Sequence, residues 1–297
     1  MSASLVGSEM CIRDRNKGYR ITEYPDIITA SEIESLLLDD SGNMQGICRH
    51  IQYFDKTDST NNQAKLAAEK NAPEGTLFVA ECQTGGRGRR GKTWESPAGS
   101  GIWMSLLLRP DISPESASML TLVLAVAMVD AINEEVQDAK CYVKWPNDIV
   151  LNNRKISGTL TEMSAEMDSI HYVVIGIGIN VNTTDFDESI KDMATSIYLG
   201  TGKKVKRSNI IAAFSHSFKK YYEAFLKTQD LTYIVDRYNE LLINKGRTVK
   251  AIYANKELVG EALGINKDGE LIIKTEDGCE TAIRAGEVSV RGLYGYV

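Results

Sequence analysis

One short basic loop holds the side chains with the clearest chemical potential. Residues 85–92 read GGRGRRGK, and Trp94 follows two residues later. Four cations within six residues, on a backbone that glycine makes mobile, suit an anionic ligand around which the loop closes. The phosphates of a nucleotide fit that description. Taken alone, the segment is explained equally well as a flexible, solvated basic loop.

The glycine spacing of this loop also satisfies G-x-G-x-x-G, through Gly86, Gly88 and Gly91. In a dinucleotide-binding fold that pattern ends a strand and opens a helix. Here the following residues, 96–101, read SPAGSG and predict turns. The pattern therefore does not indicate a dinucleotide site.

Two lysines farther along the chain could meet a second anionic group. Lys144 opens the segment KWPND at 144–148, and Lys155 lies in RKISG at 154–158. If both are presented from neighbouring strand ends, the two ammonium groups can reach one phosphate or carboxylate. Composition alone favours a plain Pro-Asn-Asp turn for the first segment.

Two further segments could approach a ligand closely. Residues 176–180 read GIGIN at the end of an apolar stretch, where glycine permits close contact or simply tight packing. Residues 59–61 read STN, for which helix capping is the default explanation, and residues 60–63 have the spacing of a capping box. Each segment is a weak or moderate signal alone, and their joint presence is much stronger.

Taken in order, these segments resemble the biotin protein ligase family from about Phe54 to the end of the chain. The family pattern has an S-T-N element, a Q-x-x-G-R-G-R loop, K-W-P-N-D, an R-K-hydrophobic-small-G strand start and G-I-G-I-N. All five are present in the family's order. The resemblance implies ATP-dependent formation of biotinyl-5′-AMP and transfer of biotin to a lysine of a biotin carboxyl carrier domain, as in acetyl-CoA carboxylase.

The resemblance also assigns residues. Those expected around biotin are Ser59, Thr60, Asn61, Gln83, Arg87, Gly88, Arg89 and Lys155. Those expected around ATP are Trp94, Lys144, Asn147, Asp148 and Asn180. Lys155, Arg87 and Arg89 would be catalytic, and magnesium would arrive with ATP near Asp148 rather than in a high-affinity site of its own. Lys92 stands where the family often has arginine and is left outside the predicted site, because lysine lacks the bidentate fork.

The implied chemistry is two displacements. The biotin carboxylate attacks the α-phosphate of ATP and expels pyrophosphate, a step that depends on positioning and charge neutralisation rather than on a base. The loop from Gln83 to Gly101 should order over the mixed anhydride and shield it from water. An acceptor lysine then attacks the acyl carbon and releases AMP. The sequence does not identify a base that would deprotonate the lysine amine.

The elements that must position these residues follow an α+β pattern, with strands and helices alternating without a strict βαβ rhythm. Strands are predicted at 51–55, 77–80, 102–108, 141–143, 149–151, 156–163 and 172–180. Helices are predicted near 29–37, 64–70, 113–136 and 210–226. The resemblance implies a central mixed sheet with flanking helices, of the class II synthetase and biotin ligase type.

After Lys245 the pattern changes to short alternating strands separated by turns, at 249–253, 258–265, 270–274, 281–284 and 288–290. That spacing predicts a small β-barrel, and the family has an SH3-like barrel there. The predicted domains are therefore an N-terminal part at 1–47, a catalytic domain at 48–244 and the barrel at 245–297.

The N-terminal part is the least regular. Residues 1–15 show no helical or strand period and are interpreted as an artefactual segment or a disordered terminus. Residues 16–21 resemble the end of the wing of the winged helix-turn-helix that bifunctional family members carry. The rest of that module is missing, so the parent protein could be a repressor while this chain lacks a recognition helix.

The composition is that of a globular protein, with 43% hydrophobic and 25% charged residues, and the net charge of −6 argues against wholesale nucleic-acid binding. The longest apolar run, Met119–Val129, is shorter than the roughly 20 residues of a membrane span. The five cysteines form no C-x-x-C pair, and no signal peptide is recognised, so a reducing cytoplasm is expected. The sequence leaves the oligomeric state open, although family members often dimerise through the central sheet.

Three alternatives remain. A lipoate-type ligase would share the architecture and the adenylation chemistry, but the basic loop and KWPND together argue against it. A nucleic-acid-binding module would use the loop cations with Trp94 as a stacking platform, and the acidic remainder of the chain weakens that reading. A biotin-operon repressor would need the recognition helix that this chain lacks.

Overall fold

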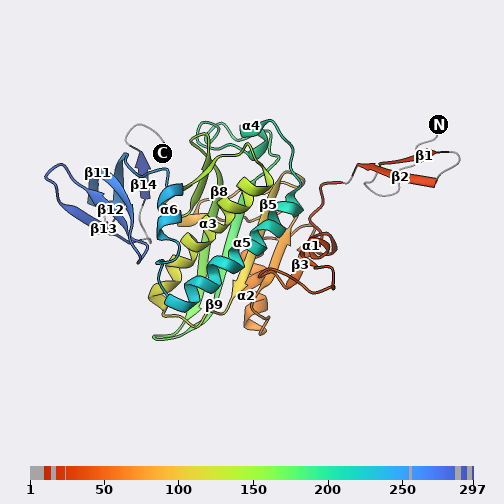
Figure 1. Cartoon of the computed structure of the whole chain (residues 1–297), viewed down its shortest axis with the longest axis horizontal. Helices are drawn as coiled ribbons and strands as arrows, with labels where there is room; N and C mark the ends of the chain where they lie inside the picture. Colours follow the sequence, from red (N-terminus) through yellow and green to blue (C-terminus); the bar gives the residue numbers. More distant parts are fainter. Residues whose placement is uncertain (1–9, 15–17, 24, 254–255, 285–288, 293–295) are drawn as a thin grey trace.

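A seven-stranded mixed sheet forms the centre of the molecule, in the order β3-β4-β5-β9-β8-β7-β6 (Figure 1). The computed structural model describes residues 10–14, 18–23, 25–253, 256–284, 289–292 and 296–297. The strands are β3 (His50–Phe54), β4 (Thr76–Ala80), β5 (Gly101–Leu108), β6 (Cys141–Lys144), β7 (Asp148–Leu151), β8 (Arg154–Ala165) and β9 (Ile170–Asn180). β3 pairs with β4 in parallel and the other neighbours are antiparallel, which confirms the predicted mixed sheet.

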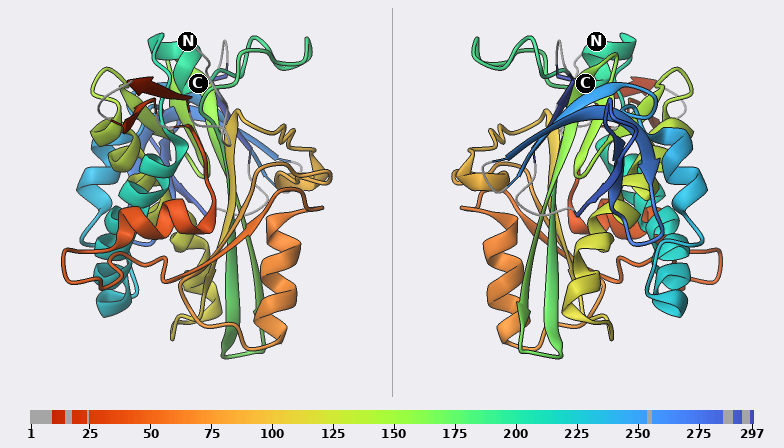
Figure 2. Two further views of the ribbon diagram at one scale, coloured as in Figure 1. Left: turned by 90° about the vertical axis from the view of Figure 1, so that its right-hand side faces the viewer. Right: turned by 90° about the vertical axis from the view of Figure 1, so that its left-hand side faces the viewer.

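Alternate residues of the central strands enter two separate cores, because side chains along a strand point to opposite faces. In β9, Val173 and Ile175 join the larger core, whereas Val174 joins the smaller one. Helices α3 (Met119–Glu135) and α5 (Arg207–Thr228) cover the larger core and α2 (Thr60–Glu69) covers the smaller (Figure 2). Coverage on both faces explains the nearly unbroken apolar run of β9.

The predicted helix after Ser113 begins as a 3-10 turn, η2 (Pro114–Ser118), and continues as α3. By length and composition alone, Pro114–Glu135 is apolar enough to cross a membrane, but 72% of its most apolar window is buried inside the protein. α3 packs between the sheet and α5, which is the position of a core helix.

The remaining helices are α1 (Ala30–Leu37), α4 (Ile197–Thr201) and α6 (Val235–Leu241). α1 confirms the helix predicted near 29–37, and of the two candidate caps, Thr29 and Ser31, the structure has Thr29. Of the predicted apolar side, Ile33 and Leu37 are buried, whereas Leu36 is exposed. The sequence did not predict α4 or α6, because both are too short to show a clear apolar period.

The five strands predicted after Lys245 are confirmed as one antiparallel sheet, in the order β13-β12-β11-β10-β14. They are β10 (Thr248–Tyr253), β11 (Lys256–Ile265), β12 (Leu271–Lys274), β13 (Glu280–Ile283) and β14 (Ser289–Gly292). This C-terminal sheet is attached to the central domain through Trp145, whose indole Nε1 donates to the carbonyl of Gly269 at 3.1 Å. The predicted domain limits at 47/48 and 244/245 stay predictions.

At the other end of the chain, β1 (Met10–Asp14) and β2 (Gly18–Glu23) form an antiparallel pair apart from the central sheet (Figure 1). The expectation that residues 1–15 hold no strand is therefore wrong for Met10–Asp14, and residues 1–9 and 15 lie outside the described residues. Backbone hydrogen bonds to β2 stabilise this strand, whereas its side chains do not alternate in a way that predicts a strand.

Candidate active site

All of the predicted site residues line one cavity of about 830 Å³. They are Ser59, Thr60, Asn61, Gln83, Arg87, Gly88, Arg89, Trp94, Lys144, Asn147, Asp148, Lys155 and Asn180. Lys92, which the sequence analysis left out, lines it too. The cavity therefore brings together predicted site residues that are up to 121 positions apart in the chain, from Ser59 to Asn180.

Strand register explains why three of the motifs meet. Lys144 pairs with Asp148 across β6 and β7, Asp148 pairs with Gly158 across β7 and β8, and Gly158 pairs with Gly178 across β8 and β9. KWPND, RKISG and GIGIN therefore lie side by side in one row across adjacent antiparallel strands. Lys144 ends β6 and Lys155 lies near the start of β8, so the two lysines come from the strands on either side of β7 rather than from neighbouring strands as predicted.

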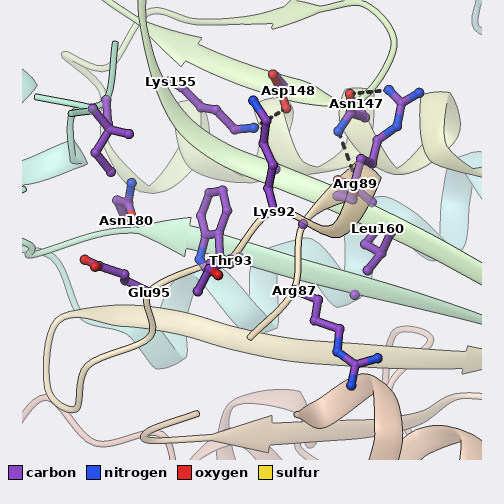
Figure 3. A pocket seen from close by; sticks show the side chains of 18 of the residues that line it. Arg87, Arg89, Lys92, Thr93, Glu95, Asn147, Asp148, Lys155, Leu160 and Asn180 are labelled. Atoms are coloured by element: carbon purple, nitrogen blue, oxygen red, sulfur yellow. Dashed lines mark hydrogen bonds and ion pairs between the residues drawn. The ribbon is translucent and has the colours of Figure 1, made fainter. Parts of the chain in front are cut away.

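A carboxylate at the centre of this ladder is surrounded by cations and one phenol. Lys155 Nζ lies 2.5 Å from Asp148 Oδ1, and the Tyr296 hydroxyl donates to Asp148 Oδ2 (Figure 3). Lys144 Nζ lies 3.5 Å from the centre of the Tyr296 ring, a cation–π contact. Burial alone would raise the pKa of Asp148, but the ammonium groups of Lys155 and Lys144 hold it below its usual value. Asp148 is therefore ionised at neutral pH.

Burial has the opposite consequence for Lys144. It lowers the pKa of this lysine to about 8, against the attraction of Asp148 and with help from the charges of Lys155, Arg291 and Lys92. Lys144 is thus protonated below about pH 8 and loses its charge above it.

We expect this titration to appear in nucleotide binding. If the cavity binds ATP as the sequence predicts, the KM for ATP should increase several-fold as the pH rises from about 7 to about 9, because Lys144, predicted to contact the nucleotide, loses its charge. Lys144→Arg should remove the inflection, since arginine stays charged throughout. Steady-state kinetics over that range checks this expectation, and an identical pH profile in Lys144→Arg would contradict it.

Within the basic loop, the structure separates the two arginines predicted to be catalytic. Arg89 Nη1 donates to Asn147 Oδ1 at 2.8 Å, and Asn147 Nδ2 donates to the carbonyl of Thr159 at 3.1 Å. The loop tip is thereby tied to the KWPND turn. Arg87 is directed away from Lys155 and Asp148 (Figure 3), and its charge instead lowers the pKa of Glu162.

Trp94 lies flat against the sheet because the sheet has glycines beneath it. A Cβ on Gly178 would lie 2.5 Å from Trp94 Nε1, and one on Gly158 would lie 3.1 Å from Trp94 Cζ3. Lys155 Nζ is 5.3 Å from the centre of a Trp94 ring. The glycines of GIGIN and RKISG therefore make room for the Trp94 ring beside Lys155.

At the other end of the cavity, residues 59–61 form a hydrogen-bonded wall. The Thr60 backbone N–H and hydroxyl both donate to Gln83 Oε1, at 2.8 and 3.1 Å. Gln83 Nε2 donates to Ser96 Oγ at 2.9 Å. The predicted capping box is wrong, because α2 begins at Thr60 with Ser59 as N-cap and no side-chain cap. The Thr60 hydroxyl is directed to the cavity wall instead.

Asn180 ends β9 with its amide turned to the backbone, since Nδ2 donates to the carbonyl of Thr195 at 3.2 Å. This contact holds the segment after β9, of which Asp185, Phe186 and Ile190 also line the cavity. Sequence reasoning missed that segment, because no spacing in it marks chemistry.

Tyr296 is the site residue that the sequence signalled least. It follows the C-terminal sheet, 148 positions after its partner Asp148. Burial and the neighbouring carboxylate raise its pKa, so the phenol stays protonated and acts as a donor. The C-terminal sheet thus contributes a side chain to the cavity.

Tyr296→Phe should lower the free energy of unfolding by about 1.5 kcal/mol, because it removes a hydrogen bond to a charged, largely buried acceptor. Urea denaturation measures the change. The matched control is Tyr233→Phe, whose side chain is 68% exposed and should shift stability by less than about 0.5 kcal/mol. Equal effects in the two variants would show that the bond to Asp148 adds nothing.

Comparisons with known proteins agree with this geometry. Residues 53–180 match the Biotin/lipoate A/B protein ligase family, and residues 246–291 match the Biotin protein ligase C terminal domain. The Bifunctional ligase/repressor BirA of Bacillus subtilis is 41% identical over 89% of this chain and 80% of that protein. A Biotin--[acetyl-CoA-carboxylase] ligase of Paracoccus denitrificans is 32% identical over 80% of this chain and 99% of its own.

Among solved structures, the biotin protein ligase from Aquifex aeolicus in complex with biotin and ATP superposes with a TM-score of 0.72 at 30% identity. The match covers 82% of this chain and 99% of that one. The fold is thus of the biotin/lipoate protein ligase class, which confirms the predicted fold class. Within that class, the chain belongs to the biotin protein ligase family and is a C–N bond-forming ligase.

Proposed function

We propose that this cavity binds biotin and ATP side by side, with biotin against residues 59–61 and Gln83 and the nucleotide along KWPND. The observation that carries the proposal is the position of Lys155, which is paired with Asp148 and lies beside Trp94 between the two ends of the cavity. An ammonium group there can neutralise the two anions that must meet, the biotin carboxylate and the α-phosphate.

In the first step a carboxylate oxygen of biotin attacks the α-phosphorus, the bond to the β-phosphate oxygen breaks, and pyrophosphate leaves. No proton moves, so the residues need only position and neutralise. Lys155 takes the central position and Arg89 closes the loop from the nucleotide side. Because Arg87 is directed away from Lys155, its catalytic assignment requires the loop to move when ligand binds.

In the second step the acceptor lysine nitrogen attacks the acyl carbon, the bond to the phosphate oxygen breaks, and AMP leaves. The amine must first lose a proton. The acceptor is proposed to be a biotin carboxyl carrier domain, in line with the relatives named as acetyl-CoA-carboxylase ligases.

Magnesium is proposed to enter with the triphosphate. Among the described residues, no group of three or more His, Cys, Asp or Glu side chains could hold a metal ion. Asp148 is the carboxylate closest to the lysines, and both of its oxygens already have partners. It therefore suits a metal that keeps most of its ligands from phosphate and water, and the metal would supply charge neutralisation of the leaving pyrophosphate. Homodimerisation and a cytoplasmic location stay predictions.

The deciding experiment is pyrophosphate release from ATP with biotin or lipoate as the carboxylic acid. Turnover with biotin and none with lipoate would support the proposal and reject the lipoate alternative. Folded protein that is inactive with both acids would overturn it. A gel shift at moderate salt would then test the nucleic-acid alternative, which rests on the loop cations and Trp94.

A further inference from the structure

Behind the wall of the cavity, a carboxylate that belongs to no motif holds the amide of Asn61. Asn61 Nδ2 lies 2.7 Å from Glu162 Oε2, and Lys65 Nζ lies 2.7 Å from Glu162 Oε1. Glu162 is not among the described residues that line the cavity, whereas Asn61 is. Glu162 therefore does not line the cavity itself, and the cavity residues it reaches are Asn61, through a hydrogen bond, and Arg87, through charge.

The charge of Glu162 decides which way the Asn61 amide points. Burial alone would raise the pKa of Glu162, but its bonds from Lys65 and Asn61 hold the pKa below its usual value. An ionised carboxylate only accepts hydrogen bonds, so Asn61 must turn its NH₂ group toward Glu162. The amide oxygen then faces Ser105, whose Oγ lies 2.6 Å from Asn61 Oδ1.

In this wall, one hydrogen-bond acceptor has no donor among the described neighbouring side chains. Ser105 Oγ is 2.6 Å from Asn61 Oδ1 and 2.7 Å from Thr60 Oγ1, and a serine has one proton for the two. The Thr60 hydroxyl gives its own proton to Gln83 Oε1. Either Thr60 Oγ1 or Asn61 Oδ1 is therefore without the Ser105 proton, and a ligand that brings N–H groups can supply the missing donor.

A glycine of β9 leaves room for the amide oxygen of Asn61. A Cβ on Gly176 would lie 2.1 Å from Asn61 Oδ1, so only glycine leaves room for the amide. Asn61 is 6% exposed and Ser105 is fully buried, which excludes most competing water. A buried acceptor in need of a donor selects strongly for ligands that carry one.

We infer that Glu162 is a positioning residue for substrate recognition, which locks the Asn61 amide so that the cavity wall offers an acceptor to the N–H groups of a cyclic urea. The inference rests on the proposed function, because the ring of biotin is such a urea. The dithiolane ring of lipoate carries no N–H group and gains nothing from this wall. Glu162 therefore also contributes to the choice between the two acids.

Calorimetric titration of biotin into the folded full chain tests the inference. Glu162→Gln keeps the shape but can donate as well as accept, so the Asn61 amide loses its fixed orientation, and we expect the Kd for biotin to rise at least about tenfold. Glu162→Met, which removes the acceptor and keeps the length, should weaken biotin at least as much. Desthiobiotin, which retains the urea ring, should lose affinity by the same factor.

The matched control is Lys65→Gln, which breaks the same ion pair but leaves the carboxylate that holds Asn61. Its Kd for biotin should stay within about threefold of wild type. Binding of α,β-methylene-ATP should be unchanged in all variants, because the nucleotide end of the cavity is not altered. A variant that had lost its overall structure would bind α,β-methylene-ATP more weakly as well.

Wild-type biotin binding in Glu162→Gln would overturn the inference, and so would equal losses in Glu162→Gln and Lys65→Gln. Either result, obtained beside a wild-type chain that binds biotin, leaves the proposed function intact. A wild-type chain that does not bind biotin would instead reject the proposed function and this inference with it. The two failures are therefore distinguishable.

Discussion

Lys155→Ala should slow the formation of biotinyl-adenylate by more than about tenfold. Lys155 Nζ lies 2.5 Å from Asp148 Oδ1 and 5.3 Å from the centre of a Trp94 ring, so the ammonium group is fixed where we propose that the biotin carboxylate approaches the α-phosphate. Without the Lys155 ammonium, the biotin carboxylate and the α-phosphate would meet beside the ionised Asp148, and these three negative charges repel one another. Single-turnover pyrophosphate release at saturating biotin and ATP measures this step directly.

The control for Lys155→Ala is Lys250→Ala, which breaks an ion pair of similar length, 2.8 Å to Glu257, in the C-terminal sheet. It should leave the rate unchanged, because surface pairs contribute little. Lys155→Arg should recover part of the lost rate, since charge is kept while the reach differs. A near-wild-type rate in Lys155→Ala would remove Lys155 from its assigned role.

The sequence predicted the parts of this site that lie on regular strands with glycine beside them. KWPND, RKISG and GIGIN each end or begin a strand, and antiparallel pairing alone sets Asp148, Gly158 and Gly178 in one row. Strand ends can be located from apolar runs and turn residues, so the proximity of these motifs was predictable.

Other parts of the site depend on tertiary contacts that local spacing does not encode. Tyr296 reaches Asp148 only because the C-terminal sheet docks on Trp145. Glu162 is an isolated charged residue of β8, which by itself is ordinary for a half-exposed strand position. Its contact with Asn61 comes from α2 packing over β5 and β9. The capping-box prediction at Thr60 failed for the same reason, because a partner distant in sequence took the hydroxyl.

Arg89→Gly should increase the fraction of biotinyl-adenylate that escapes into solution before transfer. The bond from Arg89 Nη1 to Asn147 Oδ1, 2.8 Å long, ties the tip of the basic loop to the KWPND turn. Burial lowers the pKa of Arg89, against the attraction of Asp148, although an arginine remains charged at neutral pH. Losing this charge-assisted bond frees the loop, and water can then reach the mixed anhydride.

The quantity to measure is released adenylate divided by adenylate formed, because this ratio is independent of the rate of the first step. We expect it to rise at least about tenfold in Arg89→Gly. Asn147→Ala removes the same bond from the other side, and should raise the ratio in the same way even though it also weakens ATP binding. If neither variant releases more adenylate than wild type, the loop does not shield the intermediate. The loop cations would then contribute to ligand binding only. A bond whose loss leaves the mixed anhydride protected cannot be what excludes water from it.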